Sequence, residues 1–402
     1  MKKLIERPLY LEKIIPLIDV DLVKVLVGFR RSGKSKILEL IKKHLLENGR
    51  KPEQFIELNF EEYANIELQD PTLLNYHLVN KVNEVEGKAY IFLDEIQEVK
   101  GFEKVINSLR TTLDVDIYIT GSNAKLLSGE LATYLAGRYI QIYIYPFSFQ
   151  EYLSVKGDEN ISNKFLEYIK EGGMPQVVAD DLPAEINKGF LRDVYNSVVL
   201  KDIIERQSIR NPELLDRTIL YAFANIARVI EAKNVVKYLK NEQRPAKVDT
   251  LMNYLQYAKD AFLLYPIKKH DVTGKEIFKS QEKYFIVDNG LREAIIGRND
   301  VDIQLVLENT VALEGIRRGY DVTVGEINGK EIDFIFAKDG EKVYVQVSYL
   351  LAEESTVKRE FAPFYEVKDN YRKVVVSLDP ILQPRDGIEH LRIEDFLLEE
   401  KW

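Results

Sequence analysis

The chain has 402 residues, 46% of them hydrophobic and 30% charged, and a formal net charge of −9. This composition predicts two or three globular domains, and the negative charge excludes a protein that binds nucleic acid over its whole surface. The lack of cysteine excludes disulfides and thiolate chemistry, and the four histidines lie far apart in the sequence, which argues against a histidine metal site or a Ser-His-Asp triad.

Short apolar runs alternate with helical patterns over the first part of the chain. The predicted strands cover residues 23–27, 54–58, 89–94, 116–120 and 139–145. The predicted helices between them cover residues 34–47, 71–85, 102–113 and 124–135. Strands that alternate with helices are typical of a parallel sheet, so we expect an α/β domain over residues 1–146.

A phosphate-binding pattern follows the first predicted strand. VLVGFRRSGKS matches G-x-x-x-x-G-K-[ST] without a gap. In this pattern backbone amides close around the phosphates, Lys34 reaches the β- and γ-phosphates, and the Ser35 hydroxyl ligates Mg²⁺. The helix that follows directs its positive end toward the anion. The residues expected to bind ATP are Gly28, Arg31, Ser32, Gly33, Lys34, Ser35 and Lys36.

Two acids end the third predicted strand. AYIFLDEIQ, residues 89–97, is an apolar run that closes with Asp94 and Glu95. Asp94 would hold the magnesium ion and Glu95 would polarise the attacking water. Taken alone, the run favours a buried strand with an acidic end. Beside the phosphate-binding pattern it predicts a Walker B element, and therefore an ATPase.

Polar residues follow the next strand as well. Ser122 or Asn123 would sense the γ-phosphate or orient the water, and the alternative for both is a turn or a helix N-cap. Arg138, in YLAGRY, is a candidate arginine finger for a neighbouring subunit, and is equally a candidate for a surface salt bridge.

These motifs resemble a known family. GFRRSGKS, IFLDEIQ, ITGSNAKLL, LAGRY and PFSFQEYL, in this order, resemble segments of the AAA+-type ATPases common in archaea and anaerobic bacteria, as do GGMPQVV and LKDIIERQSIRN. The resemblance covers about residues 10 to 350. It implies an ASCE-type P-loop fold with the acid-bearing strand beside the P-loop strand. It also implies a second half of poorly defined function.

The middle of the chain is predicted to be helical. We expect a helical lid or linker over residues 147–211 and a winged helix-turn-helix over residues 212–300. Residues 233–283 hold eleven Lys or Arg and six Asp or Glu, a local charge of +5. The candidate DNA contacts on the wing are Lys268, Lys269, Lys275 and Lys279. The alternatives are a solvated lysine-rich hairpin or a contact with protein.

The last predicted domain, residues 301–402, resembles the PD-(D/E)xK nuclease core. In that core a helix acid, a strand acid and an acid-x-lysine strand hold Mg²⁺ and polarise water. Glu308 and Asp333 occupy two matching positions, but Gln346 stands where a carboxylate is usual and Ser348 where lysine is usual. Gln is a poorer Mg²⁺ ligand and serine carries no charge. We therefore favour a fold kept for binding or assembly over an active nuclease.

Three functions follow from these observations. The first is a Mg²⁺-dependent, ATP-driven switch that acts on or near double-stranded DNA. The second is an ATP-gated nuclease, in which Lys358 on a following helix is a candidate replacement for the missing lysine. The third is a signalling or scaffold ATPase whose C-terminal half binds protein. Assembly as a homo-oligomer is open in all three. No apolar run reaches the roughly 18 residues that span a bilayer, so we expect a cytoplasmic protein without a membrane partner.

Overall fold

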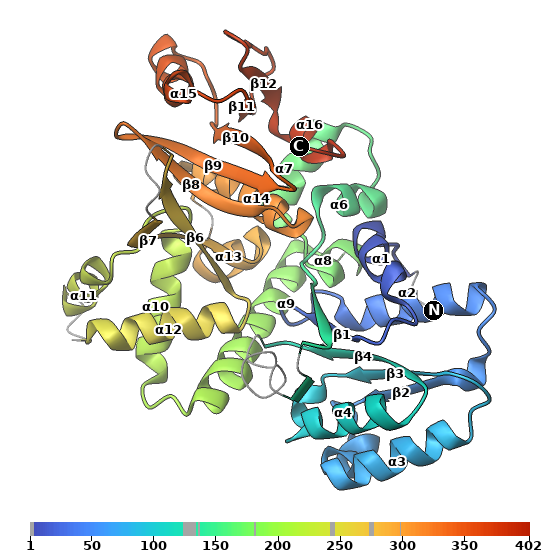
Figure 1. The fold of residues 1–402 in the computed structure, drawn as a ribbon. Helices are drawn as coiled ribbons and strands as arrows, with labels where there is room; N and C mark the ends of the chain where they lie inside the picture. Colours follow the sequence, from blue (N-terminus) through green and yellow to red (C-terminus); the bar gives the residue numbers. More distant parts are fainter. Residues whose placement is uncertain are drawn as a thin grey trace. The chain divides into compact units, whose positions relative to one another are not determined.

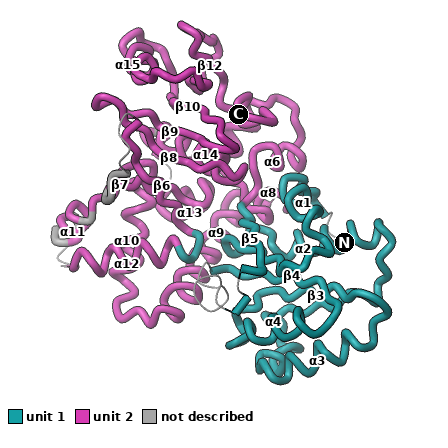
Figure 2. Tube along the Cα trace, viewed as in Figure 1, with its two compact units in different colours: residues 1–145, 260–262 teal, residues 146–259, 263–402 magenta. Residues whose placement is uncertain are grey.

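The computed structural model describes residues 4–123, 134–135, 137–180, 182–241, 246–272, 277–297 and 299–402. The chain forms two compact units (Figure 2). Unit 1 contains residues 1–145 and 260–262, and unit 2 contains residues 146–259 and 263–402. Within the described ranges, none of the helices has both the length and the apolar surface that crossing a membrane requires.

Unit 1 is built on a parallel sheet. Its strands are β1 (Val23–Val27), β2 (Phe55–Asn59), β3 (Ala89–Asp94), β4 (Val115–Gly121) and β5 (Tyr139–Tyr143). Its α-helices are α1 (Pro8–Ile14), α2 (Lys34–Glu47), α3 (Pro71–Asn83) and α4 (Phe102–Thr112). Its short 3-10 turns are η1 (Ile15–Leu17), η2 (Pro52–Gln54), η3 (Tyr63–Gln69) and η4 (Ile96–Glu98). The predicted helix over 124–135 lies almost wholly outside the described residues.

The strand order of this sheet is β2-β3-β4-β1-β5, and every pair is parallel (Figure 1). The prediction of a parallel α/β domain is therefore confirmed. The expectation that the acid-bearing strand lies beside the P-loop strand is wrong, because β4 lies between β1 and β3. Strand pairing is a long-range property, and the length and polarity of β3 carry no information about its neighbours.

Successive side chains of a strand point to opposite faces of the sheet, so the buried strands contribute to an apolar layer on each face. On one face, Tyr10 and Ile14 of α1 and the apolar side of α2 pack against Leu26, Phe92 and Tyr118. On the other face α4 contacts β4 and α3. Because all five residues of β1 are buried, the loop that follows Val27 starts from a fixed position.

Unit 2 begins with helices. These are α6 (Phe149–Lys156), α7 (Ile161–Glu171), α8 (Pro175–Asp180), α9 (Ala184–Ser197), the π-helix η6 (Val198–Glu205), α10 (Pro212–Ala224), α11 (Ala232–Asn241) and α12 (Val248–Asp260). The later helices are α13 (Asn289–Ile296), η7 (Asp300–Asp302), α14 (Ile303–Arg318), α15 (Glu354–Glu366) and α16 (Ile393–Leu398). The strands are β6 (Leu264–Asp271), β7 (Ile277–Ile286), β8 (Asp321–Ile327), β9 (Lys330–Lys338), β10 (Glu341–Val347), β11 (Arg372–Ser377) and β12 (Glu389–Arg392).

One seven-stranded sheet joins the strands of unit 2, in the order β12-β11-β10-β9-β8-β6-β7. The hairpin β6–β7 enters this sheet through a parallel pairing of β6 with β8, in which Lys269 lies opposite Val324. The hairpin that the sequence assigns to a winged helix and the strands that it assigns to the last domain thus share one sheet, across the boundary placed near residue 300.

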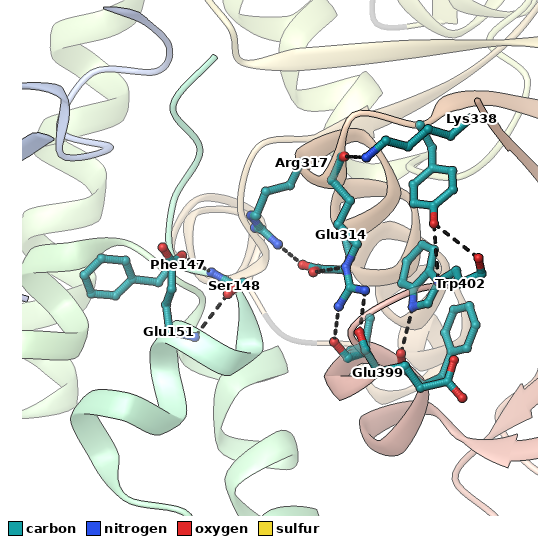
Figure 3. Close-up of polar contacts among 12 residues, drawn as sticks. Phe147, Ser148, Glu151, Glu314, Arg317, Lys338, Glu399 and Trp402 are labelled. Atoms are coloured by element: carbon teal, nitrogen blue, oxygen red, sulfur yellow. Dashed lines mark hydrogen bonds and ion pairs between the residues drawn. The ribbon is translucent and has the colours of Figure 1, made fainter. Parts of the chain in front are cut away.

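Buried polar contacts fix the start of unit 2. Arg317 of α14 donates to the carbonyl oxygen of Pro146 at 3.3 Å. It also pairs with Glu314 (Figure 3). The phenol of Tyr168 donates to the carbonyl oxygen of Phe147 at 3.0 Å. Ser148 and Glu151 form a reciprocal capping box that begins α6. The first residues after unit 1 are therefore held by α7 and α14.

The GGMP segment of the sequence has a clear structural role. Asp288 is buried, accepts a hydrogen bond from the amide of Gly173 at 2.6 Å, and caps α13 through the amide of Leu291. A Cβ on Gly172 would lie 2.2 Å from the Asp288 carboxylate, so only glycine fits there. Burial raises the pKa of Asp288 to about 6, although three backbone amides favour its ionised form.

Candidate nucleotide-binding site

The loop between β1 and α2 has the backbone that a phosphate cradle needs. Gly28 has a φ of 152°, and a Cβ added to it would lie 2.1 Å from the carbonyl oxygen of Ile144. Gly33, with a φ of 100°, caps α2 in the left-handed region, and Arg31 also has a positive φ of 63°. These positive φ values turn the chain sharply before α2, and the N-terminus of the helix points into the turn.

The side chain of Lys34 lies inside this loop. It is 4% exposed, and its ammonium donates to the carbonyl oxygens of Gly28 at 3.2 Å and Phe29 at 3.3 Å. It also lies 3.5 Å from a carboxylate oxygen of Glu95. The ammonium is therefore positioned at the loop, and protein oxygens balance its charge there.

Asp94 and Glu95 lie at the carboxyl end of β3 and are held by Thr120 of β4. The Thr120 hydroxyl donates to Asp94 and accepts the backbone amide of Glu95 at 2.9 Å. Glu95 has a φ of 53°. This left-handed backbone conformation turns the Glu95 side chain away from the direction of the Asp94 side chain. The strand between β1 and β3 thus supplies the residue that aligns the acid pair.

The two acids differ in their electrostatics. Burial raises the pKa of Asp94, and hydrogen bonds with Ser35 and Thr120 only partly oppose this. Burial acts in the same direction on Glu95, but the charge of Lys34 and a hydrogen bond from Gln97 outweigh it, so the pKa of Glu95 is lowered. Glu95 is therefore ionised at neutral pH.

The remaining predicted residues divide between the two edges of the sheet. Ser122 and Asn123 are buried at the end of β4, and Ser122 hydrogen-bonds Glu95. Arg138 is exposed, and its carbonyl oxygen accepts the amide of Val23 at the start of β1. It therefore lies at the opposite edge from the phosphate loop, roughly 15 Å away along the five residues of β1. Arg138 does not reach the phosphate loop of its own chain.

Two basic residues near the loop differ from the expectation. Lys36 turns away from the loop and pairs with Glu39 on the exposed side of α2. Arg7, which the motif search did not identify, is 2% exposed and donates to the carbonyl oxygens of Ser32 at 3.0 Å and Tyr145 at 2.8 Å. Arg7 precedes Pro8 in an N-terminal segment without a motif, so local sequence gave no signal for it.

The acids predicted in the C-terminal half lie close together. Glu308 of α14 and Asp333 of β9 are both buried, and Gln346 of β10 accepts the amide of Asp333 at 3.2 Å. Burial raises the pKa of Asp333 well above its ordinary value, and the charge of Glu308 raises it further. Ser348 is buried just after β10 and bonds through its amide to Val376.

The basic residue beside these acids is not Lys358, which is exposed on α15. It is Lys283 of β7, whose ammonium lies 3.6 Å from Glu308 and 2.6 Å from Glu331. The sequence predicts β7 as part of a wing, and no motif marks Lys283 for a role at these acids. An alternating strand has no local feature that marks such a long-range ion pair.

The predicted wing lysines are in different environments. Lys269 is paired with Glu326 at 2.5 Å and Glu331 at 3.4 Å, so its charge is already balanced by carboxylates. Lys268 is exposed on β6. Lys275 and the side chain of Lys279 lie outside the described part of the chain.

A serine, a histidine and an aspartate meet in unit 2, although the histidine spacing argued against it. The hydroxyl of Ser377 lies 2.8 Å from Nε2 of His390 and donates to Asp379 at 2.7 Å. Nδ1 of His390 accepts the backbone amide of Gln383. In a catalytic triad the histidine lies between the acid and the serine, whereas here the serine lies between the other two. All three are buried, and the group is structural.

Comparisons with known proteins agree with the first site. A family model described as an AAA domain matches residues 21–153, and one described as a domain of unknown function matches residues 162–302. An uncharacterized protein of Haemophilus influenzae is 38% identical and aligns with 99% of this chain and 100% of its own length. An uncharacterized protein of Methanocaldococcus jannaschii is 29% identical, over 95% of this chain and 86% of its own.

Solved structures match less well. A Walker-type ATPase of Pyrococcus abyssi has a TM-score of 0.48 and 16% identity, covering 72% of this chain and 95% of its own. The Orc1 protein of Aeropyrum pernix in complex with DNA has a TM-score of 0.34 and 12% identity, covering 73% and 93%. The identity over both full lengths shows that this chain belongs to the family of the Haemophilus influenzae protein, and its residues 21–153 are an AAA domain of the P-loop ATPase class.

Proposed function

We propose that this protein binds ATP with Mg²⁺ and hydrolyses it, and that the ATP cycle acts as a switch on or near double-stranded DNA. The observation that carries the ATPase part is the meeting of the start of α2 and the end of β3 at one edge of the sheet. Ser35 of α2 hydrogen-bonds Asp94 at the end of β3, and Lys34 lies 3.5 Å from Glu95. Phosphate binding, metal binding and water activation need these groups together.

The residues at this edge fit a magnesium ion. Mg²⁺ is bound through one or two protein oxygens together with waters and substrate phosphates. The Ser35 hydroxyl, which lowers the pKa of Asp94, and the Asp94 carboxylate are such a donor pair and would hold the ion. The bound ion would neutralise charge that develops on the phosphate oxygens.

Glu95 is the proposed base. It is buried and its pKa is lowered, so at neutral pH it can accept a proton from water. In the arrangement described here, Lys34 and Gln97 both bind its carboxylate. A triphosphate in the loop would attract the ammonium of Lys34 away from Glu95. Nucleotide binding would then free the carboxylate for a water molecule.

Calorimetry with Mg·ATP tests the site. Lys34→Ala is expected to abolish the heat of binding, because no other described ammonium lies inside the loop. Lys43→Ala is a matched control on the same helix, since its exposed side chain pairs with Glu6 away from the loop. Unchanged binding by Lys34→Ala would contradict the nucleotide site.

The DNA part of the proposal concerns α10, α11, α12 and the hairpin β6–β7. Three helices followed by a hairpin are the elements of a winged helix-turn-helix, and residues 233–283 are locally basic in an acidic chain. Because Lys269 is paired with two carboxylates, the contact that we propose on the described part of β6 is Lys268.

The test measures ATP turnover with and without duplex DNA and follows the integrity of the DNA in the same tube. We expect DNA to stimulate turnover and binding to weaken with salt. Lys268→Glu is expected to weaken binding and to reduce the salt slope by about one phosphate contact. Lys330→Glu, at an exposed lysine of β9, serves as the control. Binding without a salt slope would contradict this proposal.

A further inference from the structure

The nuclease-like resemblance of the C-terminal half implies a divalent cation among buried acids. The acidic cluster consists of Glu308 of α14, Glu331 and Asp333 of β9, and Glu360 of α15. Glu308, Asp333 and Glu360 are each less than 10% exposed. A nearby cation stabilises the charged form of buried carboxylates of this kind, because an unpaired buried charge is costly. The question is which cation does so.

The oxygen donors of the cluster are largely occupied by protein. Asp333 accepts the amide of Val347 at 2.9 Å through one of its oxygens. Gln346 turns its carbonyl oxygen toward the amide of Asp333 and donates its amide nitrogen to Glu360 at 2.8 Å. The other oxygen of Glu360 accepts from Arg359. The single side-chain oxygen of Gln346 therefore accepts a backbone amide, and both carboxylate oxygens of Glu360 are hydrogen-bonded.

Lys283 supplies a positive charge at this point. Lys283 is 7% exposed, and its ammonium lies 2.6 Å from Glu331 and 3.6 Å from Oε2 of Glu308. Oε2 of Glu308 is buried and makes no hydrogen bond to any described residue. The ammonium is thus the nearby charge that balances this oxygen. Across the described ranges, no group of three or more His, Cys, Asp or Glu is arranged to hold a metal ion.

We infer that the ammonium of Lys283 takes the place of the divalent cation in the acidic cluster. The donor set does not fit a metal: two acids are engaged by protein groups, the third position is a neutral Gln, and an internal cation balances Glu308 and Glu331. The cluster is then an ion-pair lock. It fastens β7 to α14 and β9, and so ties the hairpin to the rest of the sheet.

This inference also explains Ser348. A lysine at position 348, two residues after Gln346, would bring a second ammonium toward a cluster that Lys283 already compensates. A small neutral side chain avoids that repulsion. The inference does not depend on the proposed ATPase function, because every residue of the lock lies in unit 2 and none belongs to the phosphate loop.

The test uses the full-length chain and Mn²⁺ without nucleotide, followed by electron paramagnetic resonance of free and bound Mn²⁺. Every variant also carries Asp94→Asn, so that the nucleotide site does not contribute. We expect this background protein to bind no Mn²⁺ in unit 2. Adding Lys283→Met should create one Mn²⁺ site per chain. Its affinity for Mn²⁺ should be about 10–100-fold higher than any residual Mn²⁺ binding by the background protein. Adding Asp333→Asn to Lys283→Met should remove that site.

Lys283→Arg is the matched control, because it keeps the charge and should bind no Mn²⁺. If Lys283→Met fails to fold, the background protein still decides the matter. Mn²⁺ bound by the background protein and lost with Asp333→Asn would overturn the inference, as would a folded Lys283→Met variant that gains no site. Plasmid cleavage by the pure protein with Mn²⁺, abolished by Asp333→Ala, would overturn it as well.

Discussion

Arg7 donates a hydrogen bond of 3.0 Å to the carbonyl oxygen of Ser32, so a residue before the first strand holds the phosphate loop. The same guanidinium donates to Tyr145 at 2.8 Å and lies 4.4 Å from the ring of Tyr10. The loop is therefore braced by the N-terminal segment and by the chain that follows β5. A motif search through the loop alone would miss this brace.

Replacement of Arg7 by alanine is expected to weaken both the fold and ATP binding. The variant leaves two buried carbonyl oxygens without their charged donor, which predicts a loss of roughly 3 kcal/mol in the free energy of unfolding. Urea denaturation and calorimetry with Mg·ATP check the two effects. Arg50→Ala is the control, because Arg50 bonds Asp19 and Tyr90 away from the loop. Equal ATP affinity in both variants would contradict the role of Arg7.

Glu95→Gln should separate binding from chemistry. The amide keeps the size of the side chain but cannot take a proton, so kcat should fall about 10²–10⁴-fold while ATP still binds. Phosphate release and calorimetry measure the two quantities on the same protein. Glu98→Gln, at an exposed acid of η4, should turn over normally. Full activity in Glu95→Gln would assign the base elsewhere.

Arg138 offers a test of assembly, because its own phosphate loop is at the opposite edge of the sheet. If Arg138 serves a neighbouring subunit, Arg138→Ala should lower kcat about 10³-fold or more with little effect on ATP binding. The turnover rate per chain of the unmodified protein should also rise as the protein concentration is raised. Mixing Arg138→Ala with Lys34→Ala should restore part of the activity. Turnover that is independent of concentration and of Arg138 would show that hydrolysis needs no neighbour.

Lys24 and Asp116 form a buried ion pair in unit 1, with exposed fractions of 0% and 2%. Burial lowers the pKa of Lys24, and Asp116 opposes that shift. Lys24→Met should destabilise the protein by about 3–5 kcal/mol, because it leaves a buried carboxylate without its cation. Urea denaturation measures the loss. Lys24→Met combined with Asp116→Asn should recover part of this loss of stability. Equal losses in the single and the double variant would mean that the unpaired charge of Asp116 is not the cause.

The His390 ring predicts a pH dependence of stability. Nδ1 accepts the amide of Gln383, and burial lowers the pKa of the ring despite the charge of Asp379. Below a pH of about 6.5 the unfolded chain binds a proton that the folded ring does not take up. The free energy of unfolding should therefore decrease as the pH falls through 6.5 toward the folded pKa.

Comparison with His390→Asn checks this contribution, because the asparagine oxygen can accept from Gln383 but does not titrate. The difference in unfolding free energy between the two proteins should shrink as the pH is lowered from 7.5 to 5, as denaturant curves at each pH would show. A constant difference would mean that His390 has its ordinary pKa when folded.

Local features of the sequence predict much of unit 1. The bounds of β1 and α2 agree with the prediction, since a buried apolar run and the glycine-lysine-serine pattern mark them directly. The position of β4 between β1 and β3 could not be predicted, because strand order depends on packing between distant segments. The alignment of Asp94 and Glu95 by Thr120 depends on that order and was missed with it.

The same reasoning applies to the charged residues of unit 2. Counting lysines identified a basic region, yet Lys269 and Lys283 each pair with acids of strands or helices that follow much later in the chain. Composition measures charge but not its partners. The partners become known only when the fold brings β6, β7, β9 and α14 together.

The parallel pairing of β6 with β8 limits where the chain can be cut into fragments that keep the sheet of unit 2 intact. A polypeptide that starts after residue 300 would lose β6 and β7, and the bare edge of β8 would be open to other chains, which is how unprotected sheets aggregate. A polypeptide that stops there would keep a two-stranded ribbon with no partner to join. A fragment that keeps this sheet whole must therefore contain every strand from β6 to β12, and gene fusions or exchanges within this family should not divide the chain near residue 300.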